Sequence, residues 1–283
     1  MIRKIIAILF IFHSSLIAQT APNIDFTDLN GVSHNLYDYL DEGLTSTLES
    51  LEKSSLAYSG AGHTEETALE AHREVINGTA FSMLGYVGWT GNSKPKQTAN
   101  ESQGGAAFGN MNNIYNTIER ERKAKHIPII QYHGSQEYAN EPTGVTEQRL
   151  KSGLDHGAAL AIAHHPHVTQ GIELYNNKLI AYSMGNFIFD QNFAATQHSF
   201  ILYVWLDGEK FHRAEIVPIY VKGYKPTPAT GKHRNLVMRR IKELSKQRNT
   251  FIAQAGGHGI ITAENKQTKS TTKTLSLPVT NNQ

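Results

Sequence analysis

Residues 158–163 are small and apolar at every position, which is the pattern of a buried β-strand. Residues 127–132 form a second apolar, β-prone run, and helical patterns cover residues 109–125 and 146–156, one ahead of each strand. Farther along the chain, short strands follow one another across tight turns such as Asn176-Asn177. Helices that alternate with strands early and hairpins that dominate late predict a mixed α/β sandwich, not a purely doubly wound sheet.

The other predicted elements fit this plan. Helices are expected at 45–55, 65–73 and 233–246, and Thr64 is a candidate N-cap for the second. Strands are expected at 56–58, 74–76, 80–87, 171–175, 179–183, 187–189, 200–206 and 211–220. A long polar loop covers residues 88–107, and such loops in compact domains are often functional or mobile.

The first eighteen residues have the features of a targeting segment. A basic start is followed by an apolar run over residues 5–12, which is shorter than the roughly 20 residues that span a bilayer. We therefore expect residues 1–18 to be a secretory signal, with an uncleaved N-terminal anchor as the alternative. In either case the body of the protein would be exported, to the periplasm or the outer cell envelope.

Composition narrows the chemistry. The 27 basic and 25 acidic residues give a net charge of +2, which argues against a dedicated nucleic-acid surface. The mean hydropathy of −0.39 excludes a multi-span membrane protein. With 0 cysteines, disulfides, thiol catalysis and thiolate metal ligands are excluded. A metal site would have to draw on the 14 histidines and on Asp, Glu and Asn.

The densest polar motif follows the buried strand at 158–163 directly. It contains His164, His165, Pro166 and His167, and strand ends are where sites gather in α/β folds. Because His165 and His167 are two residues apart, both can point the same way and form half of a site for Zn, Mn or Fe. The alternative is a histidine-rich surface loop. We leave His164 out of the expected ligand set.

Two further strand ends carry polar side chains. His133 ends the apolar run at 127–132 and becomes a third ligand candidate, with Glu137 and Tyr138 close behind it. Asn186 lies in a Gly-Asn turn, where it could hold a ligand oxygen or could simply form the turn. We expect His133, His165 and His167 to converge. We assign catalysis to His165 and Glu137, and substrate binding to Asn186 and Tyr138.

These same segments carry a family resemblance. "YHGSQEY", "AHHPHVTQGIELYNNKLIAYSMGNFIFDQ" and "LYVWLDGEKFHRAEIVPIYVKGYKPTPATG" resemble the CapA family of capsule and poly-γ-glutamate synthesis proteins. The likeness covers roughly residues 42–250 and places one domain at 44–250, with a polar tail at 251–283. The family resembles calcineurin-like metallophosphoesterases, which implies a two-sheet sandwich flanked by helices with a two-metal centre at the strand ends. By that likeness His133 and His165 would bind one metal and His167 the other.

The chain also departs from the family pattern. The opening strand with its Asp ligand and the following Asn-Leu-Glu segment are absent, and the Asn-Asn-His turn is reduced to Ser33-His34-Asn35, with Asp38 after it. The fold is therefore expected to lack its first strands, and the site to lack a bridging carboxylate. Two-metal chemistry needs that bridge to hold ions about 3.5–4 Å apart. We therefore expect at most one tightly bound divalent ion, Mn, Zn or Fe.

Residues 19–43 are of uncertain origin, because they weakly resemble the opening of secreted thioredoxin-like proteins, which suggests a join near Gly43. The leading hypothesis is an exported CapA-like protein with a metal-dependent hydrolase site that acts on an anionic envelope polymer or its precursor, beside membrane-bound synthesis machinery. The alternative is a non-catalytic remnant or accessory protein that binds the polymer or supports its export. A third possibility is an incomplete chain with an uncovered sheet edge.

Overall fold

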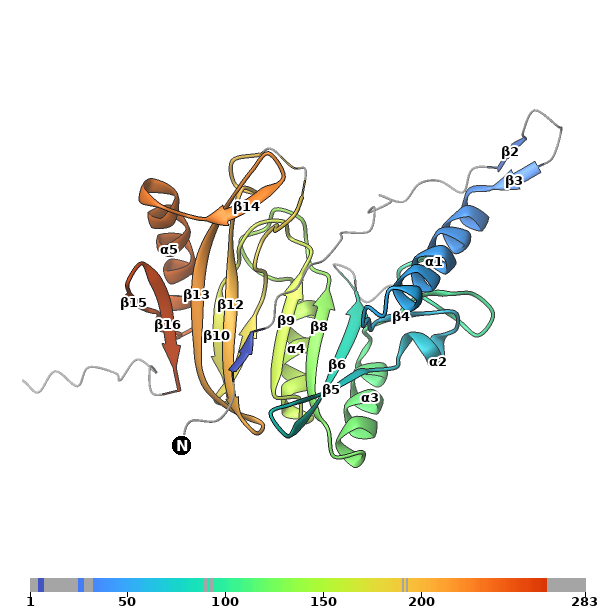
Figure 1. Cartoon of the computed structure of the whole chain (residues 1–283), viewed down its shortest axis with the longest axis horizontal. Coiled ribbons are helices and arrows are strands. Elements are labelled where there is room, and N and C mark those ends of the chain that lie inside the picture. The colour runs from blue at the N-terminus through green and yellow to red at the C-terminus, as the bar shows by residue number, and fades with distance from the viewer. Residues whose placement is uncertain are drawn as a thin grey trace, which may run out of the picture.

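The computed structural model describes residues 5–7, 25–27, 33–88, 91, 94–189, 191 and 193–263, with side chains from residue 43 onward. Two large sheets lie beside one another, and helices cover them (Figure 1). The helices are α1 (Leu36–Lys53), α2 (Glu65–Ala68), α3 (Met111–Lys123), α4 (Gly144–Asp155) and α5 (Gly231–Lys246). The two-sheet α/β architecture with flanking helices is confirmed.

The first sheet carries the strand ends of interest and has six strands in the order β10-β11-β9-β8-β6-β5. Its strands are β5 (His72–Ile76), β6 (Thr79–Val87), β8 (Ile127–His133), β9 (Leu160–His164), β10 (Ile172–Tyr175) and β11 (Lys178–Ala181). The four central strands are parallel, whereas β5 and β10 are joined to them as antiparallel hairpins at the two edges. Parallel pairing brings the carboxyl ends of β8 and β9 to one edge of the sheet.

The second sheet is antiparallel and also has six strands. Its strands are β1 (Ile5–Ala7), β12 (His198–Asp207), β13 (Lys210–Lys222), β14 (Lys225–Pro228), β15 (Ala253–Ala255) and β16 (His258–Thr262). The long hairpin β12–β13 forms the centre of this sheet. The chain turns between Asp207 and Lys210, where the turn was expected. The remaining strands form two small antiparallel sheets of two strands each, β2 (Asp25–Thr27) with β3 (Ser33–Asn35) and β4 (Ala61–Gly62) with β7 (Gly105–Ala106).

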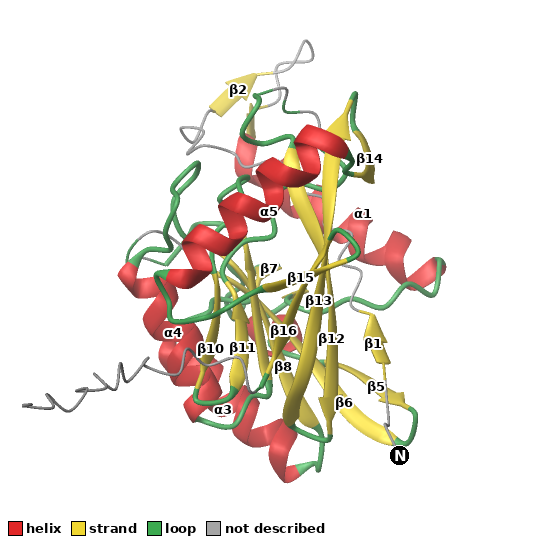
Figure 2. Cartoon of the chain, turned by 90° about the vertical axis from the view of Figure 1, so that its left-hand side faces the viewer, coloured by secondary structure: helices red, strands yellow, loops and turns green. Residues whose placement is uncertain are grey.

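Alternating side chains of the first sheet enter two separate cores. One face packs against the second sheet and α5, through residues that include Ile129, Leu160, Phe200 and Ile241. The other face packs against α3 and α4, which lie along one side of the sheet (Figure 2). The sequence pattern at 158–163 follows from this double burial, because successive side chains from Leu160 to Ala163 enter opposite cores and both faces of the strand are apolar.

Several details differ from the sequence-based expectations, and one of them is that residues 56–58 form no strand. Helix α2 ends at Ala68 and not near residue 73, because His72–Ile76 pairs with β6 as strand β5, although Thr64 caps the helix as predicted. The strand expected at 187–189 is not formed, and residues 187 and 188 are bends. Residue 251 was expected to begin a polar tail, but the residues after it form β15 and β16. Strand β16 pairs with β13, and β15 pairs with β16, so both belong to the second sheet. Residues 264–283 lie outside the described residues.

The N-terminal expectations fall mostly outside the described residues. Of the predicted leader at 1–18, the structure describes only Ile5–Ala7, which pairs with β12. Residues 19–43 include the hairpin β2–β3 and the start of α1, without described side chains. Among the described residues, no helix is both long and apolar enough to cross a membrane.

Candidate metal centre

The candidate site lies where β8 and β9 end. The two strands are parallel neighbours, and their last residues, His133 and His164, are register partners. The loop after β8 carries Glu137 and Tyr138, and the turn after β9 carries His165 and His167. The loop and the turn are joined by the backbone, since the amide of Tyr138 donates to the carbonyl of Pro166 at 2.8 Å. Segments separated in sequence are thereby held side by side.

The three predicted histidines converge. Nδ1 of His165 lies 3.2 Å from Nε2 of His133, and the centroids of these two rings are 5.0 Å apart. The ring centroids of His165 and His167 are 5.9 Å apart. His165 is therefore the middle member, with one neighbouring ring on either side.

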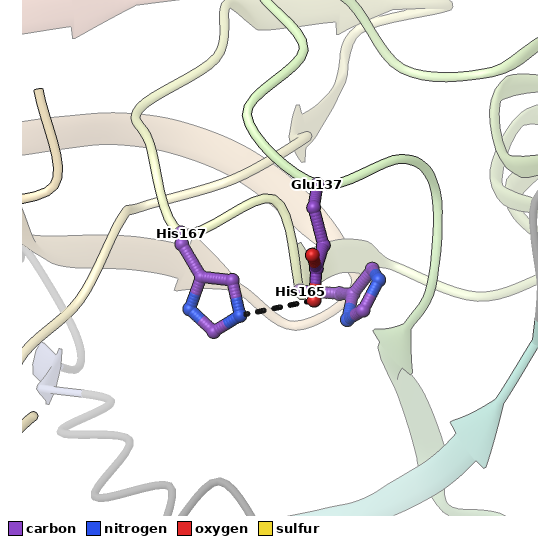
Figure 3. A group of neighbouring side chains, drawn as sticks. All are labelled: Glu137, His165 and His167. Carbon is purple, nitrogen blue, oxygen red and sulfur yellow. Dashed lines mark ion pairs between the residues drawn. The ribbon is translucent and has the colours of Figure 1, made fainter. Parts of the chain in front are cut away.

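The most compact group of potential ligands differs from the predicted trio. Ligand atoms of Glu137, His165 and His167 all lie within 4.8 Å of one another, and this group does not include His133. Figure 3 shows the carboxylate of Glu137 reaching between the two imidazoles. Oε1 of Glu137 is 3.9 Å from Nε2 of His167. A carboxylate, which the sequence assigned to catalysis, thus stands among the histidines.

A hydrogen-bond chain orients His167. Its Nδ1 atom lies 2.9 Å from Oδ1 of Asn186, and the amide nitrogen of Asn186 donates to Gln191. Gln191 in turn donates to the hydroxyl of Tyr138 at 2.9 Å. Because an amide oxygen only accepts, the proton of the neutral imidazole lies on Nδ1, and Nε2 turns its lone pair toward Glu137. The substrate-binding roles of Asn186 and Tyr138 stay predictions, but both side chains already support the cluster.

The backbone around the cluster is strained. His165 has a φ of 105° and His167 a φ of 62°, while Ser135 and Tyr138 in the facing loop have φ values of 94° and 60°. Residues other than glycine rarely adopt a positive φ, and each one that does destabilises the folded state by on the order of 1–3 kcal/mol. Strain of this kind persists where the surrounding structure holds it, and it gathers at functional sites.

Burial favours the neutral form of His133, His164 and His165. Burial, together with the smaller effect of the neighbouring imidazoles of His165, His164 and His167, lowers the pKa of His133 to about 3. Burial also lowers the pKa of His165, with a smaller lowering from His167 and an opposing effect of Glu137. The pKa of His164 falls to about 4 for the same reason. Neutral imidazoles are the form that binds metal ions.

The donor set fits a divalent ion. Two imidazoles and one carboxylate, with positions left open, form a set known for catalytic zinc and for non-haem ferrous iron. The separation of His133 and His165 also fits, because two nitrogens about 2.0–2.1 Å from a tetrahedral zinc lie about 3.3 Å apart. Asn186 supplies the hydrogen bond to the second ring nitrogen that metal-binding histidines usually make.

Two residues of the site were missed from the sequence. Gln191 joins Asn186 to Tyr138, and Phe189 lies with its ring centroid 5.0 Å from that of His167. Both belong to the run "NFIFDQ" that follows the Gly-Asn turn, so their position next to Asn186 was the available signal. The side chains of His34, Asn35 and Asp38, which could replace missing ligands, lie outside the described residues.

Comparison with known proteins defines the class. Residues 15–191 match the family model described as bacterial capsule synthesis protein PGA_cap. The chain is 31% identical over 233 residues to the PGA biosynthesis protein CapA of Bacillus subtilis (strain 168), an alignment that covers 82% of this chain and 60% of that protein. The chain therefore belongs to the bacterial capsule synthesis protein family.

Two more similarities are weaker. The capsule biosynthesis protein CapA of Bacillus anthracis is 28% identical over 227 residues, which cover 78% of this chain and 54% of that protein. The chain thus spans only 60% and 54% of these two relatives. A solved structure from Staphylococcus aureus, named as a candidate 5'-nucleotidase, superposes with a TM-score of 0.36 at 10% identity, over 64% of this chain and 36% of that one. A superposition at that level carries no conclusion about activity.

Proposed function

We propose that this protein is an exported member of the capsule synthesis family and that the cluster at the ends of β8 and β9 binds a divalent metal ion. With that ion the site would hydrolyse a bond in an anionic envelope polymer or in a precursor of the polymer. The observation that carries the proposal is the compact group of Glu137, His165 and His167, placed between two strained loops. The resemblance of the family's sequence motifs to metallophosphoesterases favours hydrolysis at phosphorus, and the polymer named for a relative favours an amide as the second substrate class.

The residues have distinct tasks in this proposal. His165 and His167 hold the ion through neutral imidazoles, and Asn186 fixes the tautomer of His167. A bound metal ion would polarise the substrate and lower the pKa of a bound water. Glu137 either completes the ligand set or accepts a proton from that water, since its carboxylate lies within 4.8 Å of both histidine ligand atoms. Tyr138, exposed beside the cluster, is positioned to contact the substrate.

The two roles of Glu137 are separable by experiment. The purified chain is loaded with Zn, Mn or Fe, and metal content is measured beside hydrolysis of a generic phosphodiester and of a γ-glutamyl amide. Glu137→Gln keeps the shape and removes the charge. Loss of bound metal identifies Glu137 as a ligand, whereas retained metal with lost turnover identifies it as the base. The matched control is Glu101→Gln, at an exposed position in the polar loop.

Other outcomes count against the proposal. A wild-type chain that binds an ion without hydrolysing either substrate would favour the alternative of an accessory protein that binds the polymer. A wild-type chain that binds less than one ion under saturating metal would remove the metal site itself. Export is tested separately, by following where the full-length chain accumulates and whether residues 1–18 are removed.

A further inference from the structure

Arg240 on α5 connects the two loops of the candidate metal centre. Its Nε atom donates to the backbone oxygen and to the hydroxyl of Thr169, both at 3.0 Å. On the other side of the same guanidinium group, Nη2 donates to Oδ1 of Asn140 at 2.9 Å. One planar group therefore bonds to two segments that are distant in the sequence.

Both partners lie close to candidate ligands. Asn140 belongs to the loop after β8, three residues beyond Glu137, and Thr169 follows His167 by two residues. The two loops also touch directly, because the side-chain amide of Gln170 donates to the carbonyl of Ala139 at 3.0 Å. Arg240 therefore bonds to both loops beside a point where they already touch.

A second arginine shows what is particular about Arg240. Arg248 also holds the loop after β8, through a 2.6 Å contact with Glu141. It also forms ion pairs with Glu147 on α4 and Glu173 on β10, neither of which belongs to the turn that carries His165 and His167. Arg248 therefore anchors the far end of the loop to the body of the fold, whereas Arg240 joins the loop to the turn that carries His165 and His167.

We propose that Arg240 is a positioning residue that sets the separation of Glu137 from His167 by holding Asn140 and Thr169 on one guanidinium fork. The inference builds on the proposed function, in which these two side chains hold or serve the metal ion. Arg240 lies on α5, outside the residues 15–191 that the family model matches.

The chemistry of the fork predicts which substitutions fail. The oxygens of Thr169 and Asn140 that accept from Arg240 are neutral, so the geometry of the donors matters more than the charge. Arg presents its donors in a rigid plane, whereas Lys carries a single compact ammonium group on a flexible stem. We therefore expect Arg240→Lys to keep the charge and to lose the connection between the loops.

The first measurement uses the metal-free full chain. Amide hydrogen exchange is followed in residues 135–143 for wild type, Arg240→Ala, Arg240→Lys and Asn140→Ala. Asn140 is exposed, so its substitution removes the acceptor with little effect on folding. Arg239→Ala, at the exposed neighbouring position of α5, is the matched control. We expect exchange to rise about tenfold in the three test variants, as expected for local opening, and to stay unchanged in the control and in Met111–Lys123.

The second measurement is Co²⁺ affinity with the visible absorption spectrum of the bound ion. Wild type and Arg239→Ala are expected to bind alike, and Arg240→Ala and Asn140→Ala about tenfold more weakly with an altered spectrum, which is the effect typical of lost outer-shell support. Added guanidinium is expected to restore part of the affinity of Arg240→Ala, because the small cation can occupy the same position.

The outcomes separate the two proposals. Unchanged exchange in residues 135–143 of both Arg240→Ala and Asn140→Ala overturns the positioning role, whatever the metal result. Equal Co²⁺ affinity and an identical spectrum in wild type and Arg240→Ala also overturn it. If exchange rises as expected but wild type binds no Co²⁺, the positioning of the loops stands and the proposed metal function fails.

Discussion

His167 donates the proton on its Nδ1 atom to Oδ1 of Asn186, over a distance of 2.9 Å, and both side chains are buried. The bond fixes which nitrogen of His167 is available to a metal ion. Asn186 is itself held in a turn at Gly185, whose φ is +76° and where an added Cβ would lie 3.0 Å from the carbonyl oxygen of His198. The turn that carries Asn186 therefore packs closely against the start of β12.

Removing this hydrogen bond should weaken metal binding. Asn186→Ala leaves His167 free to turn and to exchange tautomers, and outer-shell substitutions of this kind typically lower metal affinity about 10- to 100-fold. Isothermal titration with zinc measures the change. Asn112→Ala, on an exposed position of α3, should bind like wild type. An unaltered affinity in Asn186→Ala would mean that His167 is not a ligand.

The neighbouring histidines of the turn should differ in their effect. His165 lies between the rings of His133 and His167 and belongs to the compact group with Glu137. His165→Ala is therefore expected to abolish binding. His164 lies outside that group, so His164→Ala should lower stability through the lost buried ring and still bind the ion. Metal content after dialysis distinguishes the two variants, and equal loss in both would contradict the assignment.

Acidification should release the ion at a lower pH than ordinary histidines suggest. Protons compete with metal for the imidazoles, and an unperturbed histidine is half protonated at about pH 6.5. Burial lowers the pKa of His133 to about 3 and also lowers the pKa of His165. We expect little release at pH 6 and progressive release below it, followed by the Co²⁺ spectrum. Complete release at pH 6 would contradict this prediction, because it would mean that water reaches the histidines more than their burial in the structure allows.

A buried carboxylate on α3 predicts a separate effect of pH on folding. Burial would raise the pKa of Glu121, but hydrogen bonds from Arg73 and Arg120 outweigh burial and lower it. Because the folded pKa is below the unfolded one, the stabilisation is complete above about pH 4.5 and is lost as pH falls through the folded pKa. Glu121→Gln should lower the free energy of unfolding by about 1.5 kcal/mol, near the lower limit for a charged hydrogen bond, since both arginines reach water.

Urea unfolding between pH 7 and pH 3 tests this prediction. Glu121→Gln should lose less stability than wild type across that range. Glu119→Gln is the matched control on the same helix, because Glu119 forms an exposed pair with Lys123 and should behave like wild type. A wild-type protein whose stability does not fall on acidification would contradict the role of Glu121.

The fold could be predicted where local sequence and packing agree. The run at 158–163 became β9 because each of its side chains meets an apolar neighbour in one of the two cores. Prediction failed where pairing between distant segments decides the structure. Residues 69–73 follow a helical pattern, yet His72 pairs with Met83 of β6, and the chain from His72 onward forms strand β5. Hairpin β15–β16 was missed because its pairing with β13 depends on contacts far away in the sequence.

The site shows the same division. His133, His165 and His167 could be predicted to converge because parallel strands end at one edge of a sheet. The place of Glu137 among the ligands could not, since it depends on the loop from β8 folding back onto Pro166. Gln191 and Arg240 were not apparent either, because each acts through a partner that only the folded chain brings near.

Glu137 also bears on how many ions the site holds. The sequence suggested three imidazoles with no anion between them, a site that could hold one ion and would repel a second. Within the described residues, the compact group adds one carboxylate to two imidazoles. One negative charge improves the binding of a first dication, but leaves a net positive site for a second, which is repelled strongly wherever water is scarce.

We therefore expect a stoichiometry of at most one tightly bound ion per chain, with weak phosphoesterase turnover, because a single ion lacks the second metal that clamps both oxygens in a two-metal centre. Elemental analysis after equilibrium dialysis against zinc or manganese measures the first quantity, and hydrolysis of a phosphodiester measures the second. Glu137→Gln should bind the single ion more weakly, because the only charge in the compact group is lost. Two stoichiometric ions with rapid hydrolysis would contradict the prediction. That result would assign ligand roles to His34, Asn35 or Asp38, and substituting each of them with Ala would then identify which one carries the second ion.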